Sequence, residues 1–107
     1  MNESGVLETD AAKRPTEVAK EAARLARKIL GPKVEVIWFG SWPLGRAQAH
    51  SDIDLAMAAA GPIPPERMAA LRELVDNVPT LYEIDLVDLA SVGQSLRTEI
   101  LLHGLKL

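Results

Sequence analysis

The stretch from residue 40 to residue 54 holds most of the chemical information in this sequence. Gly40 and Ser41 end an apolar run, and Asp52 and Asp54 follow after ten intervening residues. In a strand, residues two apart point to the same side, so Asp52 and Asp54 would project their carboxylates together. Two adjacent carboxylates repel unless a cation such as Mg²⁺ lies between them. A Gly-Ser turn offers N–H groups and a hydroxyl to phosphate, so the spacing predicts a phosphoryl- or nucleotidyl-transfer site.

A third carboxylate would let such a site activate an attacking hydroxyl or complete a second metal position. The candidates lie within residues 82–88, where Glu83 and Asp85 share one face of a predicted strand and Asp88 falls on the other. Asp85 has an apolar residue on each side, and a charge in the middle of an apolar strand is costly unless it is paired or used. Asp88 lies at the strand end beside the predicted Ser91 cap, where a carboxylate costs little. We therefore choose Asp85, with Glu83 second.

The elements that must position these residues follow from the apolar periodicity. The pattern predicts a helix from Pro15 to about residue 30, strands over 34–39, 52–57 and 81–89, a helix over 64–77, and a last helix capped by Ser91. Alternating elements of this kind indicate an α/β or α+β fold, with a sheet covered by helices. Residues 1–14 are polar and patternless, so we expect a flexible tail followed by one domain over 15–107.

Composition narrows the class of protein. The chain has 107 residues, a net charge of −3, 48% hydrophobic residues and no cysteine. These values are typical of one globular domain, and they favour neither general nucleic-acid binding nor a disulfide framework. The sequence contains no apolar run long enough for a membrane span and no signal-peptide pattern, so we expect no membrane association and a cytoplasmic location.

Three short motifs occur together: FGS at 39–41, SDIDL at 51–55 and IDL at 84–86, with Gly45 between the first two. In this combination the chain, from about Val18 to its last residue, resembles the minimal nucleotidyltransferases (MNT) of the DNA polymerase β-like superfamily. The resemblance implies that superfamily's fold, a small mixed sheet covered by helices. Many members carry Arg and Ala after the Ser, where this chain has Trp42 and Pro43.

The resemblance also implies a role for each candidate residue. Gly40 and Ser41 would bind the triphosphate of ATP, and Asp52, Asp54 and Asp85 would bind Mg²⁺, with two metal ions expected. Such metals neutralise the triphosphate while pyrophosphate leaves in line with the attacking oxygen. Asp85 would help to deprotonate the acceptor hydroxyl, directly or through a metal.

Members of this branch are often encoded beside a helical HEPN protein. The pair resembles a toxin–antitoxin module in which the MNT protein transfers AMP from ATP to a tyrosine of its partner and silences it. The resemblance therefore implies a protein adenylyltransferase that acts as an antitoxin. A chain of this length leaves no room for a domain that grips the acceptor, so the acceptor would be held by a partner, by a second copy in a homo-oligomer, or would itself be a protein surface.

Several alternatives stay open at this point. The chain could be a weak or inactive MNT antitoxin that works by binding its partner, or it could modify a small molecule. Trp42 fits either the core or the nucleotide pocket. The C-terminal leucines fit the core, a partner interface or both. The first helix also carries a basic stripe, which fits either a solvated face or a docking surface. That stripe consists of Lys20, Arg24, Arg27 and Lys28.

Overall fold

The computed structural model describes residues 10–107. Four strands form one sheet in the order β3-β2-β1-β4, with the bounds β1 (Glu35–Phe39), β2 (Ile53–Ala58), β3 (Ile84–Asp88) and β4 (Leu105–Lys106). Strand β1 runs antiparallel to β2 and β4, whereas β2 and β3 are parallel. The predicted fold class, a small mixed sheet covered by helices, is therefore confirmed.

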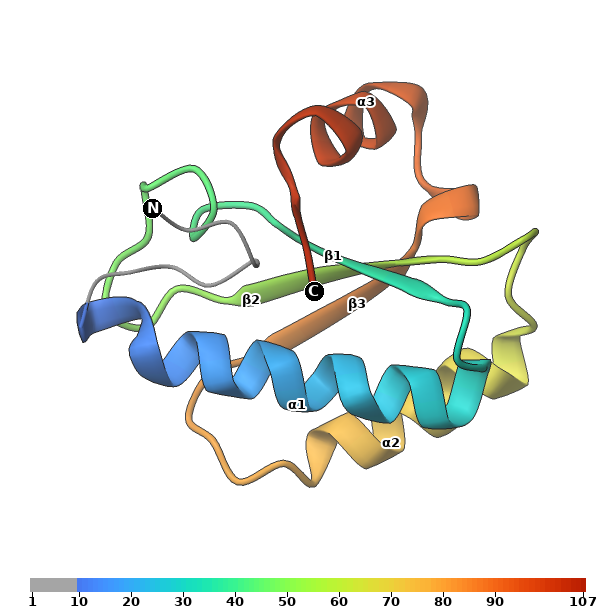
Figure 1. The fold of residues 1–107 in the computed structure, drawn as a ribbon, viewed down its shortest axis with the longest axis horizontal. Coiled ribbons are helices and arrows are strands. Elements are labelled where there is room, and N and C mark those ends of the chain that lie inside the picture. Colours follow the sequence, from blue (N-terminus) through green and yellow to red (C-terminus); the bar gives the residue numbers. More distant parts are fainter. Residues whose placement is uncertain (1–9) are drawn as a thin grey trace.

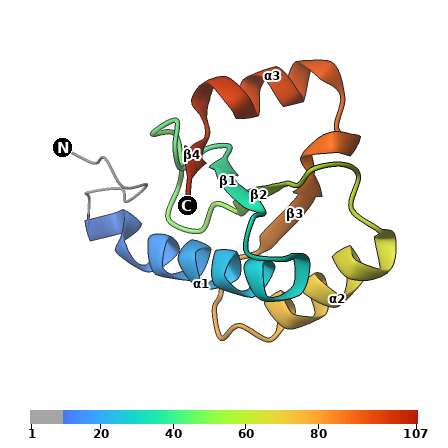
Figure 2. The same cartoon turned by 45° about the vertical axis from the view of Figure 1, so that its right-hand side comes forward.

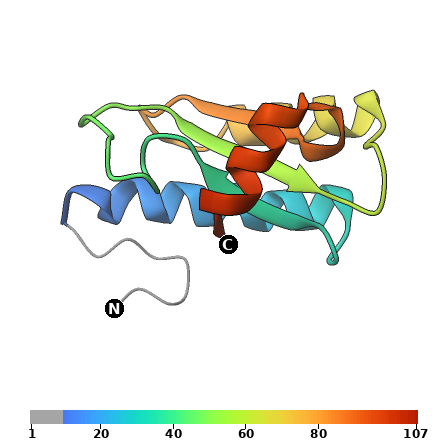
Figure 3. The ribbon, with the colours of Figure 1, turned by 90° about the horizontal axis from the view of Figure 1, so that it is seen from above.

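The helices lie on both faces of this sheet. Helices α1 (Lys13–Leu30) and α2 (Pro65–Asp76) cover one face, and α3 (Gln94–His103) covers the other (Figure 1). Figure 2 shows α1 and α2 side by side beneath the strands, with α3 alone on the opposite face. Seen from above, α3 crosses over the strands of the sheet (Figure 3). One face is thus covered by two helices and the other by a single helix.

Helix α1 packs closely because small residues dominate its buried face. Ala19, Ala22, Ala23 and Ala26 are at most 1% exposed, which brings the helix backbone near the sheet. The helix ends at Gly31, whose φ of 111° is accessible to glycine and strained for other residues.

Strand β2 has two different faces. Ile53, Leu55 and Met57 are fully buried against the layer of α1 and α2. The alternate residues face α3, where Ala56 joins a smaller apolar cluster and Asp54 is only half-buried. The face beneath α3 is therefore apolar in its middle and acidic at the end where β2 begins.

The ordered structure differs from the predicted elements at several boundaries. Residues Asp10–Ala12 form a 3-10 turn and α1 begins at Lys13, so regular structure starts before the predicted boundary at residue 14. Residues 1–9 of the predicted tail lie outside the described residues. Helix α3 begins after Gly93, and Ser91 does not cap it, because the Ser91 hydroxyl instead donates to the carboxylate of Asp88 at 3.3 Å.

The C-terminal residues form strand β4, which the sequence did not predict. The N–H of Leu107 donates to the carbonyl of Val36 at 2.9 Å, and Arg27 donates to the carbonyl of Leu107 at 2.5 Å. Arg27, one of the two arginines of the basic stripe, thus binds the chain's own C-terminal segment. Leu101 and Leu102, by contrast, are 56% and 71% exposed on α3. Of the helices within residues 10–107, none has both the length and the apolar character needed to cross a membrane.

Candidate active site

The parallel pairing of β2 with β3 places Asp54 opposite Asp85. Ile53 and Leu55 point into the core between the sheet and α1, so Asp54 points to the other face. The same alternation turns Asp85 to that face, since its neighbours pack toward the core. Asp52 precedes the strand, is exposed, and lies two residues before Asp54. Three carboxylates predicted from separate motifs therefore gather at one end of the sheet.

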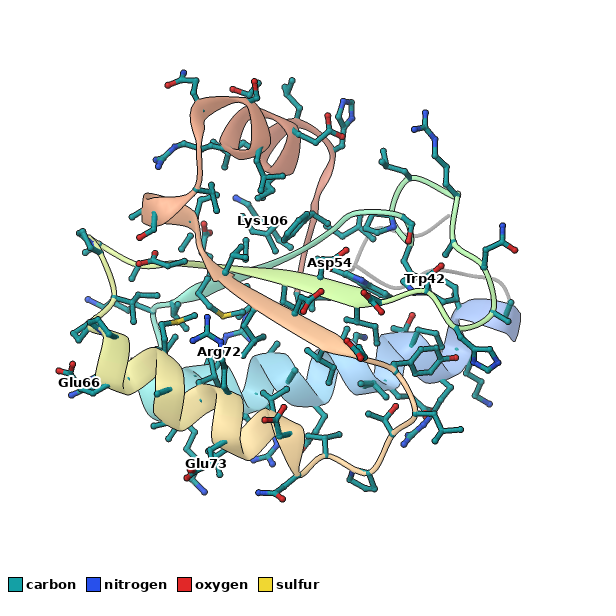
Figure 4. All side chains as sticks on the ribbon, turned by 180° about the vertical axis from the view of Figure 1, so that it is seen from behind. Trp42, Asp54, Glu66, Arg72, Glu73 and Lys106 are labelled. Carbon is teal, nitrogen blue, oxygen red and sulfur yellow. The ribbon has the colours of Figure 1, made fainter. Side chains whose placement is uncertain are left out.

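Gly40 lies directly against this carboxylate pair. Phe39, the last residue of β1, pairs with Asp54, and Gly40 then turns the chain with a φ of 88°. A Cβ atom on Gly40 would overlap Oδ2 of Asp54 and lie 3.3 Å from its Cγ. Glycine is required here both by the backbone conformation and by the space that the carboxylate occupies. Figure 4 shows Asp54 and Trp42, just beyond this turn, at the same end of the molecule.

The surroundings of Asp54 raise the pKa of its carboxyl group to about 6. The largest cause is burial, which penalises the charged form, followed by the negative charges of Asp85 and Asp52 and a hydrogen bond with Asp85. A carboxyl group with this environment is short of positive charge. A cation placed beside Asp54 would oppose this rise in pKa, because its positive charge favours the ionised carboxylate.

The oxygen donors of this cluster suit Mg²⁺. That ion is usually held by one or two carboxylates, with water and substrate phosphates completing its octahedral shell. In the part of the chain that the structure describes, no three Asp, Glu, His or Cys side chains converge closely enough to enclose a metal by themselves. The facing pair Asp54 and Asp85 therefore fits an ion that substrate oxygens help to hold, and does not form a closed protein cage.

The loop after Ser41 is folded back on itself. The N–H of Arg46 donates to the carbonyl of Ser41 at 2.9 Å, and the indole N–H of Trp42 donates to the carbonyl of Ser51 at 3.1 Å. Trp42 is 8% exposed and packs between the rings of Trp38 and Tyr82. The open question about Trp42 is therefore answered in favour of the core. The sequence did not reveal its bond to Ser51; its position next to Ser41 was the signal available.

The other acidic candidates lie elsewhere. Glu83 precedes β3 and is exposed, and it supports the sheet through its carbonyl, which accepts the N–H of Ile53 at 2.8 Å. The carboxylate of Asp88 accepts the N–H groups of Ile63 at 2.8 Å and Ala90 at 3.1 Å. Asp88 is thus a structural carboxylate, and Asp85 is the residue of this segment that faces Asp54.

A polar cavity of about 420 Å³ opens beside Asp85. It lies between the end of α2 and the segment leading into β3, and its lining includes Asp76, Thr80, Tyr82, Glu83 and Asp85. A larger, apolar cavity of about 530 Å³ lies beyond the far end of β2 and contains none of the candidate residues. Of these two cavities, the polar one adjoins the carboxylate cluster.

Several solved structures have a similar fold. A toxin–antitoxin crystal structure with AMP-PNP aligns with a TM-score of 0.66 and 28% identity, over 82% of this chain and 70% of the other. A mutant MntA-HpeT toxin–antitoxin complex aligns with a TM-score of 0.65 and 30% identity, over 82% of this chain and 69% of the other. The complex of a tri-AMPylated Shewanella oneidensis HEPN toxin with MNT antitoxin aligns with a TM-score of 0.63 and 24% identity, over 84% of this chain and 68% of the other. At this identity the likeness is one of fold. No curated protein matches the chain.

The family model described as polymerase beta, nucleotidyltransferase matches residues 20–107. This range contains the Gly-Ser turn, all three candidate aspartates and every strand of the sheet. The chain belongs to the polymerase beta nucleotidyltransferase family.

Proposed function

We propose that this chain is an Mg²⁺-dependent adenylyltransferase that moves AMP from ATP to a tyrosine hydroxyl of a HEPN-type partner, and so acts as an antitoxin. Membership of the nucleotidyltransferase family supports the reaction class. The likeness to a toxin–antitoxin complex containing AMP-PNP, an ATP analogue, supports both the nucleotide and the partner. The choice of AMP as the transferred group follows the AMPylated toxin in the Shewanella complex.

One observation carries this proposal: the contact between the Gly-Ser turn and the aspartate pair. Asp54 faces Asp85 across β2 and β3, and its carboxylate fills the space where a Gly40 side chain would lie. A phosphate held by the turn at Gly40 and Ser41 would therefore lie next to the carboxylates. A substrate that carries both phosphate oxygens and a metal ion, such as Mg·ATP, matches that juxtaposition.

Each residue then has a defined task. Ser41 and the backbone of the turn would bind the β- and γ-phosphates of ATP. Asp52, Asp54 and Asp85 would hold Mg²⁺, which would neutralise the triphosphate and polarise the α-phosphate. Asp85 would accept the proton of the acceptor hydroxyl. In the transfer, the acceptor oxygen forms a bond to the α-phosphorus, the bond from that phosphorus to the bridging oxygen breaks, and pyrophosphate leaves.

The acceptor must approach from the side of Asp85. The Gly-Ser turn flanks Asp54 on the β1 side, and β3 is an edge strand with the polar cavity beside Asp85. Triphosphate on one side and open space on the other give the in-line order of leaving group, α-phosphorus and acceptor oxygen. A protein surface can enter such an open edge, which is consistent with a partner protein as the acceptor.

The proposal is tested by incubating the chain with ATP, Mg²⁺ and the HEPN protein encoded beside it, and then measuring the mass of both proteins. The expected result is a gain of one or more AMP units on the partner, abolished by Asp85→Asn. Tight complex formation without any mass gain would instead assign the chain to binding-only antitoxins. Turnover of ATP with a small molecule and no partner would assign it to small-molecule nucleotidyltransferases.

A further inference from the structure

Trp42 connects the two halves of the candidate nucleotide site. It directly follows Ser41 at the phosphate-binding turn. Its indole N–H donates to the carbonyl oxygen of Ser51 at 3.1 Å. That carbonyl belongs to the peptide group whose nitrogen is the backbone N of Asp52, so the hydrogen bond fixes the orientation of the backbone just before the first aspartate.

The same ring also reaches the segment that carries the third aspartate. Trp42 meets the ring of Tyr82 edge to face, with centroids 6.3 Å apart and an interplanar angle of 80°. Tyr82 lies three residues before Asp85. On its other side Trp42 packs against Trp38 of β1, at 6.5 Å and 43°. Held between two aromatic rings and 8% exposed, the indole cannot shift without moving one of these neighbours.

The loop between the turn and β2 shows why this link matters. Its first half closes on itself through the hydrogen bond from Arg46 to Ser41, and its second half through the bond from the Gln48 N–H to the Ser51 hydroxyl at 2.7 Å. Each half is thus ordered locally. The bond from Trp42 to Ser51 joins the two halves.

We infer that Trp42 is a positioning residue that sets the distance between the phosphate-binding turn and the metal-binding aspartates. It acts through the Ser51 carbonyl on Asp52 and through Tyr82 on the segment of Asp85, and it touches no substrate. This inference rests on the proposed function, because it assumes that the turn binds phosphate and the aspartates bind Mg²⁺.

Such a role predicts a specific kinetic change. If the link is lost, the turn still binds the triphosphate, but the aspartates no longer hold the metal in the right place. The affinity for ATP without Mg²⁺ should then stay within about threefold of the wild-type value, while kcat falls about tenfold or more, since small misplacements of reacting groups cost rate more than binding. The strengthening of ATP binding by Mg²⁺ should fall as well, because it needs both the phosphate-binding turn and the metal-binding aspartates in place.

The two tryptophans of the chain provide a matched pair of variants. Trp42→Phe keeps an aromatic ring in the core and removes the donor to Ser51. Trp38→Phe makes the same change in a ring that is 0% exposed and whose N–H has no hydrogen-bond partner among residues 10–107. Both variants lose comparable packing, and only one loses a hydrogen bond. Trp38→Phe also leaves Trp42 as the sole tryptophan, so that its fluorescence reports directly on the site.

The experiment measures ATP affinity with and without Mg²⁺, together with thermal unfolding, for the wild type and both variants. We expect Mg²⁺ to strengthen ATP binding in the wild type and in Trp38→Phe, and to have little effect in Trp42→Phe at a similar melting temperature. In Trp38→Phe, the emission of Trp42 should change when Mg·ATP binds, which tests the link without altering Trp42 itself.

Two kinds of failure are distinguishable. If the wild type responds to Mg²⁺ and Trp42→Phe responds equally, or if Trp42 emission ignores Mg·ATP, the positioning role is wrong and the proposed function stands. If the wild type binds no ATP in the presence of Mg²⁺, the proposed function is wrong, and the positioning role is wrong with it.

Discussion

The carboxylate of Asp54 occupies the space in which a side chain on Gly40 would lie. Gly40 directly follows β1 and Asp54 lies in β2, 14 positions later, yet the pairing of β1 with β2 brings them together. This contact means that the Gly-Ser turn and the aspartate cluster cannot be changed independently. It also makes Gly40 the residue whose replacement tests the arrangement most simply.

Replacing Gly40 by Ala should be costly for two separate reasons. The φ of 88° is strained for alanine, and the new Cβ would displace Asp54. Gly45→Ala is the matched control, because Gly45 has a φ of 72° with open space around it. We expect Gly45→Ala to lower the unfolding free energy by about 1–2 kcal/mol and Gly40→Ala by about 3 kcal/mol or more. If Gly40→Ala and Gly45→Ala lose the same amount of stability and the same amount of Mg²⁺-dependent ATP binding, the contact between Gly40 and Asp54 has no importance.

The stability of the metal-free protein should depend on Asp54. Its pKa in the folded protein, about 6, lies above its ordinary value of 3.8, so the folded state binds the proton more tightly than the unfolded state. Stability should therefore fall as the pH rises through about 6 and recover as the pH is lowered toward 4. Because the side chain is half-buried and solvent screens part of the charge, we expect an effect of about 1 kcal/mol, or about 4–8 °C in melting temperature.

Thermal unfolding between about pH 7 and pH 4 measures this dependence, because that range spans the raised and the ordinary pKa of Asp54. Asp54→Asn should remove it, since the amide does not titrate. Mg²⁺ should stabilise the wild type more at the higher pH, where it does not compete with the proton. A wild-type melting temperature that follows the same pH curve as Asp54→Asn would contradict the assignment.

Asp85 and Glu83 offer a second matched pair. Asp85→Asn removes a negative charge that faces Asp54 and should raise the melting temperature of the metal-free protein by a few degrees, while abolishing nucleotidyl transfer. Glu83→Gln changes an exposed residue before β3 and should leave both quantities near their wild-type values. Differential scanning fluorimetry with and without Mg²⁺, followed by a transfer assay, checks both variants. If transfer is lost in Glu83→Gln and kept in Asp85→Asn, the third carboxylate of the site is Glu83 and not Asp85.

Asp88 should matter for folding alone. Its carboxylate accepts hydrogen bonds from the backbone of Ile63 and Ala90, which tie the segment before α2 to the end of β3. Asp88→Ala leaves these donors without their acceptor and should cost about 1–3 kcal/mol. ATP affinity, measured well below the lowered melting temperature, should stay at the wild-type value; a selective loss of affinity would place Asp88 in the site.

The sequence predicts the carboxylate cluster well because strand alternation and apolar flanks act locally. Asp54 and Asp85 each stand between apolar neighbours, and those neighbours dictate which face the aspartates take. The pairing of the two strands, which sets Asp54 opposite Asp85, is a long-range choice that spacing along the chain does not encode. The overlap of Asp54 with the space beside Gly40 depends on that pairing too.

Other features could not be predicted from the sequence, because they too depend on contacts made in the folded chain. Strand β4 is two residues long, and it forms because Leu107 and Lys106 reach the edge of β1, not because of their own propensity. The bond from Trp42 to Ser51 spans a loop whose shape no periodic pattern describes. Ser91 was interpreted as a helix cap, but Asp88 competes for its hydroxyl and α3 starts later, at Gln94.

The transfer of AMP itself is tested most directly by the position of a radioactive label in ATP. The chain is mixed with Mg²⁺, the proposed HEPN partner and ATP labelled at either the α- or the γ-phosphate. Adenylyl transfer predicts that the partner retains the α-label on a tyrosine and never the γ-label, which leaves with pyrophosphate. Retention of the γ-label, or of neither label while the two proteins bind tightly, would contradict an adenylyltransferase built from Gly40, Ser41 and the three aspartates.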